Sequence, residues 1–257
     1  MRRIGRTSRI LVGLALIVSV VLDTDTARAA QAVSDVNRRE AARYYRDGLE
    51  FLSAEQYEKA AESFRKAIEK DRLLALAYYG LGQSTMALKR YATAALAFRN
   101  CRDVYAELAG LALSETVVAE RQRDDEIRDL RDAIRLFQSN TVKTASPDRT
   151  QYIVRLESRL RELERMKQTN IRPQKPPAFV YLSLGSAYFR NGQVDAAERE
   201  WKTAVDIDPR FGEAHNNLAA LFAMSGRRQD AEAEVQAAER AGYRVHPQLK
   251  EDIRKLP

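Results

Sequence analysis

Residues that could perform catalysis or bind a metal are few in this chain. One cysteine, Cys101, and two histidines, His215 and His246, occur in 257 residues. No HExxH or CxxCH motif is present, so neither a zinc site nor covalently bound haem is expected. No GxGxxG or GxxxxGK segment is present to bind a phosphate group. The sequence therefore predicts no catalytic residue, no metal site, no cofactor and no enzymatic activity.

Packing roles explain these side chains more simply. Cys101 follows Ala67 by 34 residues and His215 follows Tyr181 by the same interval, which is the period of the repeat described below. A buried packing role is favoured for both, with a reactive or intermolecular thiol as the alternative for Cys101. A single cysteine excludes an internal disulfide. His246 precedes a proline in a turn, and no function is assigned to it.

Charged residues of both signs are interspersed along the chain. There are 43 lysines and arginines against 36 acidic residues, a formal net charge of +7. Residues 1–29 contain five arginines and two aspartates, so the chain without them carries about +4. Nucleic-acid binding would need clustered basic residues without acidic neighbours, and it is not expected. Solvated pairs on helix faces are the expected arrangement of these charges.

Aromatic and small residues recur at a fixed interval of 34 residues. The set Tyr44, Gly48, Tyr57, Ala60 and Phe64 returns as Tyr78, Gly82, Tyr91, Ala94 and Phe98. A period of this length is typical of a helical hairpin that is repeated along the chain. One hairpin cannot bury its apolar face alone, so neighbouring hairpins must stack. The prediction is a stack of helices that presents a surface to other molecules.

A third copy and a weaker fourth copy follow towards the C-terminus. The third has Tyr181, Leu184, Gly185, Tyr188, Ala197, Trp201, Ala204 and Pro209, and the fourth has Leu218, Ala219, Phe222, Ala231, Val235 and Ala238. The pattern resembles the tetratricopeptide repeat (TPR), in units 41–74, 75–108, 178–211 and 212–245. The resemblance, to an exported bacterial type, implies an all-α fold, a TPR-type α-solenoid that winds as a right-handed superhelix.

The resemblance also defines a repeat core. Large rings are expected to pack over small residues where the two helices of a hairpin cross closely. The residues expected in this core are Tyr44, Gly48, Ala60, Phe64, Tyr78, Gly82, Ala94, Phe98, Tyr181, Gly185, Ala197 and Trp201.

The first 29 residues have the pattern of an export signal. Arginines at 2, 3, 6 and 9 precede an apolar run from Ile10 to Leu22, and Ala27-Arg28-Ala29 supplies small residues at a cleavage site. The run is shorter than the roughly 20 residues of a membrane-spanning helix. We expect cleavage after Ala29 and a periplasmic protein. The alternative is an uncleaved signal that anchors the chain in the inner membrane.

The 34-residue period fails between Ala109 and Pro177. Two helical patterns occur there, one around Ile127–Phe137 and one around Ile153–Met166. Residues 109–170 therefore form either an inserted, charged helical hairpin or a degenerate repeat. A solvated hairpin whose narrow apolar stripe docks on the repeats is favoured, and a dimerising or partner-binding coiled coil is the alternative.

Boundaries of the remaining segments follow from composition. The N-terminal TPR pair is expected at 30–108, a proline-rich linker at 171–177, the C-terminal TPR pair at 178–245 and a capping helix at 246–257. The sequence does not set the relative orientation of the two pairs.

In TPR proteins the first helix of each hairpin lines a concave groove. The resemblance places in that groove Tyr45, Leu49, Leu52, Tyr79, Gln83, Met86, Phe179, Leu182, Ser186, Phe189, Arg190 and Asn216, with Glu213, Ala220 and Met224. This set suits the apolar face of a helix or an extended peptide. The alternative is that some of these side chains pack against the middle hairpin. A carboxylate-terminated chaperone tail is not expected to bind, because Tyr45 and Leu49 offer it no cation.

The function expected from these features is a non-enzymatic protein-protein interaction scaffold of the bacterial cell envelope. Its partner would be a peptide or helix of an envelope complex, with no nucleic acid and no small-molecule substrate. The alternative is a structural protein that self-associates, as a homo-oligomer, through the middle hairpin or the solenoid ends.

Overall fold

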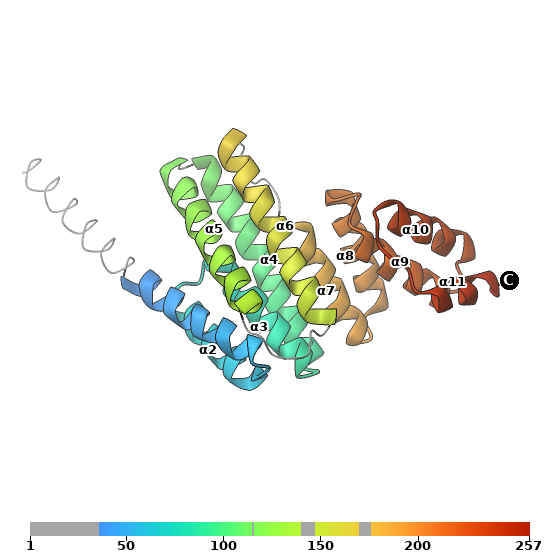
Figure 1. Ribbon diagram of the computed structural model, residues 1–257, viewed down its shortest axis with the longest axis horizontal. Helices are drawn as coiled ribbons and strands as arrows, with labels where there is room; N and C mark the ends of the chain where they lie inside the picture. Colours follow the sequence, from blue (N-terminus) through green and yellow to red (C-terminus); the bar gives the residue numbers. More distant parts are fainter. Residues whose placement is uncertain (1–35, 115, 140–146, 170–175) are drawn as a thin grey trace, which may run out of the picture.

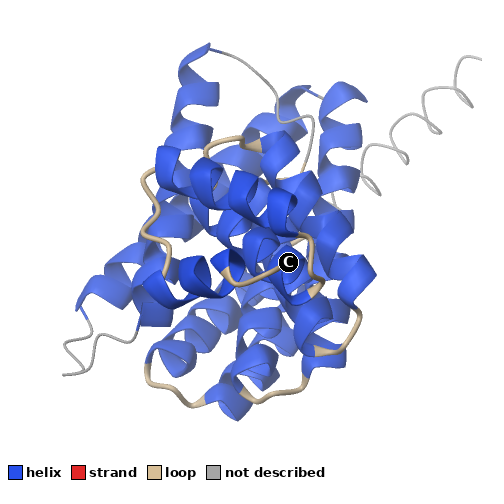
Figure 2. Cartoon of the chain, turned by 90° about the vertical axis from the view of Figure 1, so that its right-hand side faces the viewer, coloured by secondary structure: helices blue, strands red, loops and turns tan. Residues whose placement is uncertain are grey.

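Helices form the secondary structure of the described part of the chain. The computed structural model describes residues 36–114, 116–139, 147–169 and 176–257, and no strand occurs in those ranges (Figure 2). The predicted signal at 1–29 lies outside the described residues, as does most of the predicted linker at 171–177. The predicted all-α solenoid is confirmed in the described ranges.

Four helical hairpins make up the repeats. A helix that covers residues 36–53 pairs with α2 (Tyr57–Lys70), and α3 (Ala75–Ala87) pairs with α4 (Tyr91–Ser114). Near the C-terminus α7 (Ala178–Arg190) pairs with α8 (Val194–Ile207), and α9 (Gly212–Met224) pairs with α10 (Arg228–Arg240). The helix α4 continues past residue 108, where the second unit was expected to end, so residues 109–114 belong to α4 and not to a separate segment.

The hairpins stack in one continuous series. The second helix of one hairpin packs on the first helix of the next, as α2 does on α3, α4 on α7 and α8 on α9. The third hairpin therefore stacks directly on the second, although residues 109–177 separate them in sequence. Figure 1 shows this series running from α2 to α11 along the long axis of the molecule.

Glycine and aromatic side chains fit together at the hairpin crossings. A Cβ atom built on Gly48 would lie 2.7 Å from Cε1 of Phe64, and one on Gly185 would lie 2.6 Å from Cδ1 of Trp201. Contacts this short leave room only for hydrogen at these positions. The small residue is therefore required by the ring of the second helix, which rests directly on it.

The middle helices α5 (Thr116–Ser139) and α6 (Pro147–Thr169) pack on each other and lie along one side of the stack (Figure 1). Their apolar stripes face inward. Buried members are Ile127, Leu130, Ala133, Ile134 and Phe137 of α5 and Tyr152, Leu156, Leu163 and Met166 of α6. These side chains belong to the same core cluster as the first two hairpins and the start of the third.

A last short helix, α11 (Pro247–Arg254), covers the end of the series. It packs on α10 and α9 and buries Ile253. Nδ1 of His246 accepts a hydrogen bond of 3.1 Å from the backbone N–H of Gln248, so this histidine caps the helix.

Candidate protein-binding surface

The groove expected from the repeats is occupied over part of its length by α6. The ring of Tyr152 on α6 stacks on that of Tyr79 on α3, with centroids 6.0 Å apart and planes at 12°. Tyr79 also meets Phe179 of α7 edge to face, with centroids 4.9 Å apart. Its hydroxyl lies 3.1 Å from Oγ of Ser183. One tyrosine thus joins the second hairpin, the third hairpin and α6.

Several side chains expected to face a partner are consequently buried. Tyr45, Leu49 and Tyr79 are each 1% exposed, and Phe179 and Leu182 are buried as well. The expectation that these five side chains are open to another protein is therefore wrong, because the structure buries them. For Tyr45, Leu49, Tyr79 and Phe179 the physical reason is that they share one core cluster with the apolar stripe of α5 and α6, which needs an apolar surface to cover it. Leu182 is buried in the separate core cluster of the C-terminal hairpins.

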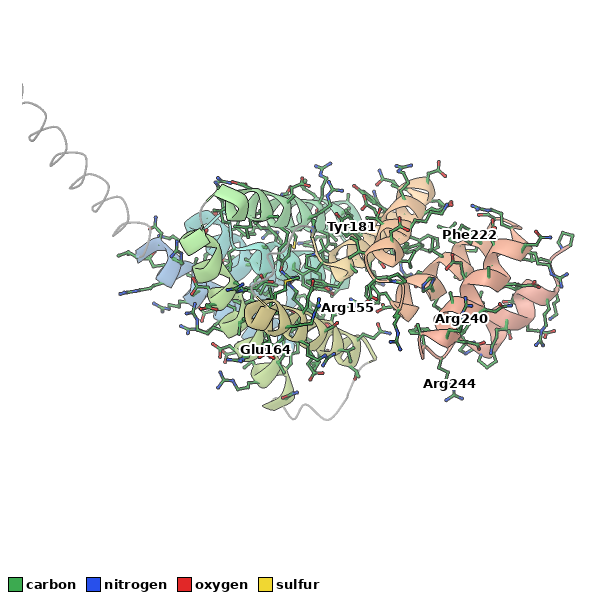
Figure 3. All side chains as sticks on the ribbon, turned by 90° about the horizontal axis from the view of Figure 1, so that it is seen from above. Arg155, Glu164, Tyr181, Phe222, Arg240 and Arg244 are labelled. Atoms are coloured by element: carbon green, nitrogen blue, oxygen red, sulfur yellow. The ribbon has the colours of Figure 1, made fainter. Side chains whose placement is uncertain are left out.

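An arginine of α6 reaches the fourth hairpin. The guanidinium of Arg155 forms an ion pair with Glu213 of α9, and both side chains are largely buried. Burial acts against the charged form of Arg155, but the neighbouring Tyr79 and Glu213 hold its pKa above the usual arginine value. Figure 3 shows Arg155 where α6 approaches the C-terminal repeats. Glu213 was expected to line the groove, but its carboxylate instead pairs with Arg155 of α6.

A second arginine of α6 is more deeply buried. The side chain of Arg159 is 1% exposed, and its Nε donates to Oε1 of Glu126 on α5 at 2.9 Å. The hydroxyl of Tyr105 on α4 donates to the same carboxylate at 2.7 Å, and the guanidinium carbon lies 5.2 Å from the tyrosine ring centre. Burial, followed by the charge of Glu126, raises the pKa of Tyr105 well above its ordinary value. A buried charge requires such partners, so this network fixes α5 and α6 on α4.

Sequence reasoning did not identify the role of Arg159, which resembled the other surface charges of α6. The signal that could have found it is its place in the stripe. Leu156, Arg159 and Leu163 follow one another at the spacing of a helix face, and the charge among the leucines marks a buried position.

The remaining predicted groove residues stay accessible. Leu52, Gln83, Met86, Ser186, Phe189 and Asn216 are partly exposed, as is Ala220, and Arg190 is exposed. Met224 of α9 is 73% exposed, the highest value among the exposed large apolar side chains of the described residues. Most of these positions lie in the later turns of α3, α7 and α9. We call the set Gln83, Met86, Ser186, Phe189, Asn216 and Met224 the open strip.

Elements of the repeat position the open strip. Met86 and Phe189 occupy the same place in successive hairpins, as Tyr78 and Tyr181 do. Phe189 rests on Trp201 with centroids 5.6 Å apart, so its ring is held from one side and accessible from the other. The arrangement offers apolar anchors separated by hydroxyl and amide groups, which suits a polypeptide segment.

The predicted repeat-core residues divide into two groups. Buried members are Gly48, Ala60, Phe64, Gly82, Ala94, Phe98, Gly185, Ala197 and Trp201, whereas Tyr44, Tyr78 and Tyr181 are only partly buried. Burial raises the pKa of Tyr78 and that of Tyr181 above the ordinary value for the phenol.

Cysteine and histidine are held by packing and hydrogen bonds. Cys101 is fully buried, and burial raises the pKa of its thiol well above the ordinary value. Nδ1 of His215 lies 2.5 Å from Oε2 of Glu234, and its Nε2 lies 3.1 Å from the backbone carbonyl oxygen of Pro209. The described residues contain no group of three or more histidine, cysteine or acidic side chains placed to hold a metal ion.

Hydropathy gives one further finding. Within the described ranges, no helix combines the length and the apolar character needed to cross a membrane.

Comparison with known proteins adds family evidence. A model described as "Tetratricopeptide repeat" matches residues 45–100, and one described as "TPR repeat" matches residues 185–226. No curated protein matches the chain.

Three solved structures are among those similar to this chain. PilW, a widely conserved type IV pilus biogenesis factor, is 15% identical over 87% of this chain and 86% of its own, with a TM-score of 0.38. A thermophilic TPR protein of Thermus thermophilus is 17% identical over 84% and 98%, with a TM-score of 0.34. PilF of Pseudomonas aeruginosa is 16% identical over 80% and 79%, with a TM-score of 0.32. At such TM-scores these likenesses decide nothing about function.

The family assignment rests on three observations that agree: the 34-residue period, the two matching repeat models, and hairpins whose rings pack over glycine at the repeating positions. This chain contains tetratricopeptide repeats.

Proposed function

We propose that this protein is a non-enzymatic scaffold that binds a polypeptide segment along the open strip. The single observation that supports it best is the exposure of apolar side chains at groove positions of successive hairpins. Met86, Phe189 and Met224 are accessible, although α6 covers the neighbouring part of the concave face. Methionine side chains adapt to varied partner shapes, and a ring anchored on one side loses little entropy on binding.

The partner segment would present two or three apolar side chains, either on one face of a helix or alternately along an extended peptide. Gln83, Ser186 and Asn216 of the open strip are partly exposed, and their polar groups would hydrogen-bond the partner's backbone or polar side chains. The hydroxyl of Ser186 already donates to the carbonyl of Leu182 at 2.9 Å, and its oxygen can still accept a bond.

We further propose that the chain is exported, cleaved after Ala29 and active in the cell envelope, as part of an assembly or anchoring complex. The support is the arginine-rich start, the apolar run and the small residues before residue 30 in the sequence. Mass spectrometry of the protein from the producing cell's envelope fraction would test this, because an N-terminus at residue 30 is expected and an intact residue 2 would contradict it.

The binding proposal is tested by site-specific photocrosslinking in the producing cell. A photoreactive amino acid at Met224 or Phe189 should yield a crosslinked partner. The same amino acid at Leu96, a 47% exposed leucine of α4 outside the open strip, should not yield that species. Identical products from all three sites would contradict the proposal.

A variant then measures the contribution of the strip. Met224→Glu with Phe189→Ala should weaken binding of the crosslinked partner at least tenfold, whereas Leu96→Glu should leave it unchanged. Circular dichroism confirms that all variants stay helical. Self-association through the middle helices has less support, because their apolar stripes are buried against the repeats.

A further inference from the structure

A pocket of about 130 Å³ lies among the N-terminal hairpins and the middle helices. Its walls come from the helix over 36–53, the connection between α2 and α3, and α4, α5 and α6. Apolar side chains form much of the lining, namely Leu73, Leu74, Leu76, Leu108 and Leu163. An apolar cavity of about 150 Å³ is large enough for a benzene ring, so this one has room for a short alkyl chain.

One carboxylate in this pocket, that of Asp129, accepts no hydrogen bond from the described residues. Asp129 of α5 is 9% exposed and lines the pocket. Its nearest ion-pair contact is Nε of Arg128 at 3.7 Å, which is longer than a hydrogen bond. Arg128 itself pairs with Asp125 at 2.9 Å and is mostly exposed. A buried carboxylate without a donor is costly, and a ligand that donates to it would remove that cost.

The described lining of the pocket contains arginines and carboxylates in equal number, and most of the carboxylates lie on α5. Burial raises the pKa of Asp129 most, Arg128 has the next largest effect and lowers it, and Asp125, Asp132 and Glu126 raise it further. The result is a pKa of about 7. Arg159, which also lines the pocket, is already engaged by Glu126 and Glu162.

Other charged groups of the pocket come from each surrounding element. Oδ1 of Asp71 accepts the backbone N–H of Leu73 at 2.9 Å, and Arg38 has an interaction of its own. Nε of Arg123 is buried and has no acceptor among the described residues. Within the described part of the chain no side chain hydrogen-bonds the Asp129 carboxylate, so a donor from outside the chain has a site to occupy there.

We propose that this pocket binds a primary ammonium group carried on an apolar stem, with the ammonium donating to Asp129 and the stem lying among the leucines. A lysine side chain has this chemistry, because its four methylenes are apolar and only its end is charged. A free alkylamine has it too. The site is separate from the open strip and does not depend on the proposed function.

Two titrations by calorimetry at pH 8 distinguish the two sources. The first adds n-hexylamine to the purified protein, with n-hexanol as the uncharged control. The second adds the peptide acetyl-Gly-Lys-Gly-amide, with norleucine replacing lysine as its control. Saturable binding of either charged probe, at least tenfold tighter than its control, is expected. The probe that binds identifies the source.

The matched variants are Asp129→Asn and Asp132→Asn, which lie on the same helix inside and outside the pocket. Asp129→Asn should abolish binding, and Asp132→Asn should change it less than threefold. Binding to wild-type protein should also weaken at pH 5.5, where Asp129 is protonated while the amine stays charged. Absence of binding by both probes at pH 8, or equal binding to the Asp129→Asn variant, would overturn the proposal.

Discussion

Single residues in this protein are selected by contacts in the neighbouring repeat as well as in their own. The ring of Phe64 rests on Gly48 of its own hairpin and on Gly80 of the next, where an added Cβ would lie 2.4 Å from Cζ. The period indicates Gly48 directly. Gly80 carries no such signal, since the third hairpin has Ser183 at that place and uses its hydroxyl to meet Tyr79. A small residue that is needed for contact with the neighbouring hairpin, such as Gly80, cannot be recognised from the pattern of one repeat.

The buried carboxylate of Asp129 gives a prediction on stability and pH. Burial raises its pKa from an ordinary aspartate value to about 7. Between about pH 4 and pH 7 the unfolded chain releases this proton while the folded chain keeps it, so the folded state loses relative stability as pH rises. The largest penalty, reached above pH 7, is about 4 kcal/mol at 1.36 kcal/mol per pKa unit.

Asp129→Asn removes the carboxylate and should therefore stabilise the protein by about 1–3 kcal/mol at pH 8, with little or no gain at pH 4. Urea unfolding of both proteins at pH 4, 6 and 8 measures the difference. Carboxylates with lowered pKa values, such as Glu107 and Glu198, are common to both and cancel. A difference that does not change with pH would show that Asp129 does not carry this penalty.

At the scale of the element, the turns between paired helices use one backbone conformation. Glu55 and Lys89 both have φ of 58°, and the equivalent residues of the later hairpins are Gly192 at 78° and Gly226 at 70°. Left-handed backbone is unfavourable for a residue with a Cβ atom and not for glycine. The first two hairpins thus tolerate a strain that the last two avoid.

Lys89→Gly should relieve that strain and raise the free energy of unfolding by about 0.5–1 kcal/mol. Gly192→Ala should lower it by a similar amount, because it introduces the same strain into the third hairpin. Thermal unfolding followed by circular dichroism checks both. The matched control is Lys59→Gly inside α2, which should destabilise by about 1 kcal/mol, as glycine does in an exposed helix interior. A destabilising effect of Lys89→Gly would show that its side chain contributes more than the conformation costs.

Helices and hairpins could be predicted from the sequence, but the docking of the middle helices could not. The period sets which residues share a hairpin, and Phe64, Phe98 and Trp201 all pack as it indicates. The apolar stripe of α6 shows only that something must cover it. Several surfaces could do so, and the choice depends on long-range fits such as Tyr152 on Tyr79 and Arg155 on Glu213. The groove residues were predicted from the pattern of their own helices, and that pattern contains no information on where α6 docks.

The whole molecule differs from a simple solenoid because α6 connects hairpins that are not neighbours. In an ordinary repeat array each unit contacts only the next, and stability is a sum of local terms. Here α6 stacks on Tyr79 of the second hairpin and binds Glu213 of the fourth. The loss of one contact of α6 should therefore lower the local stability of a distant hairpin.

Arg155→Met provides the test, because it keeps an apolar stem but removes the guanidinium that holds Glu213. A largely buried carboxylate left without its partner costs about 1–3 kcal/mol. Amide hydrogen exchange in α9 and α10 should accelerate about tenfold or more, while α2 stays unchanged. Glu213→Gln should act in the same direction, and the double variant should fall short of the sum, since both changes break one interaction. Arg161→Met, at an exposed position of α6, is the matched control. If exchange in α9 is the same in all four variants, the hairpins behave as independent neighbours and α6 only covers the concave face.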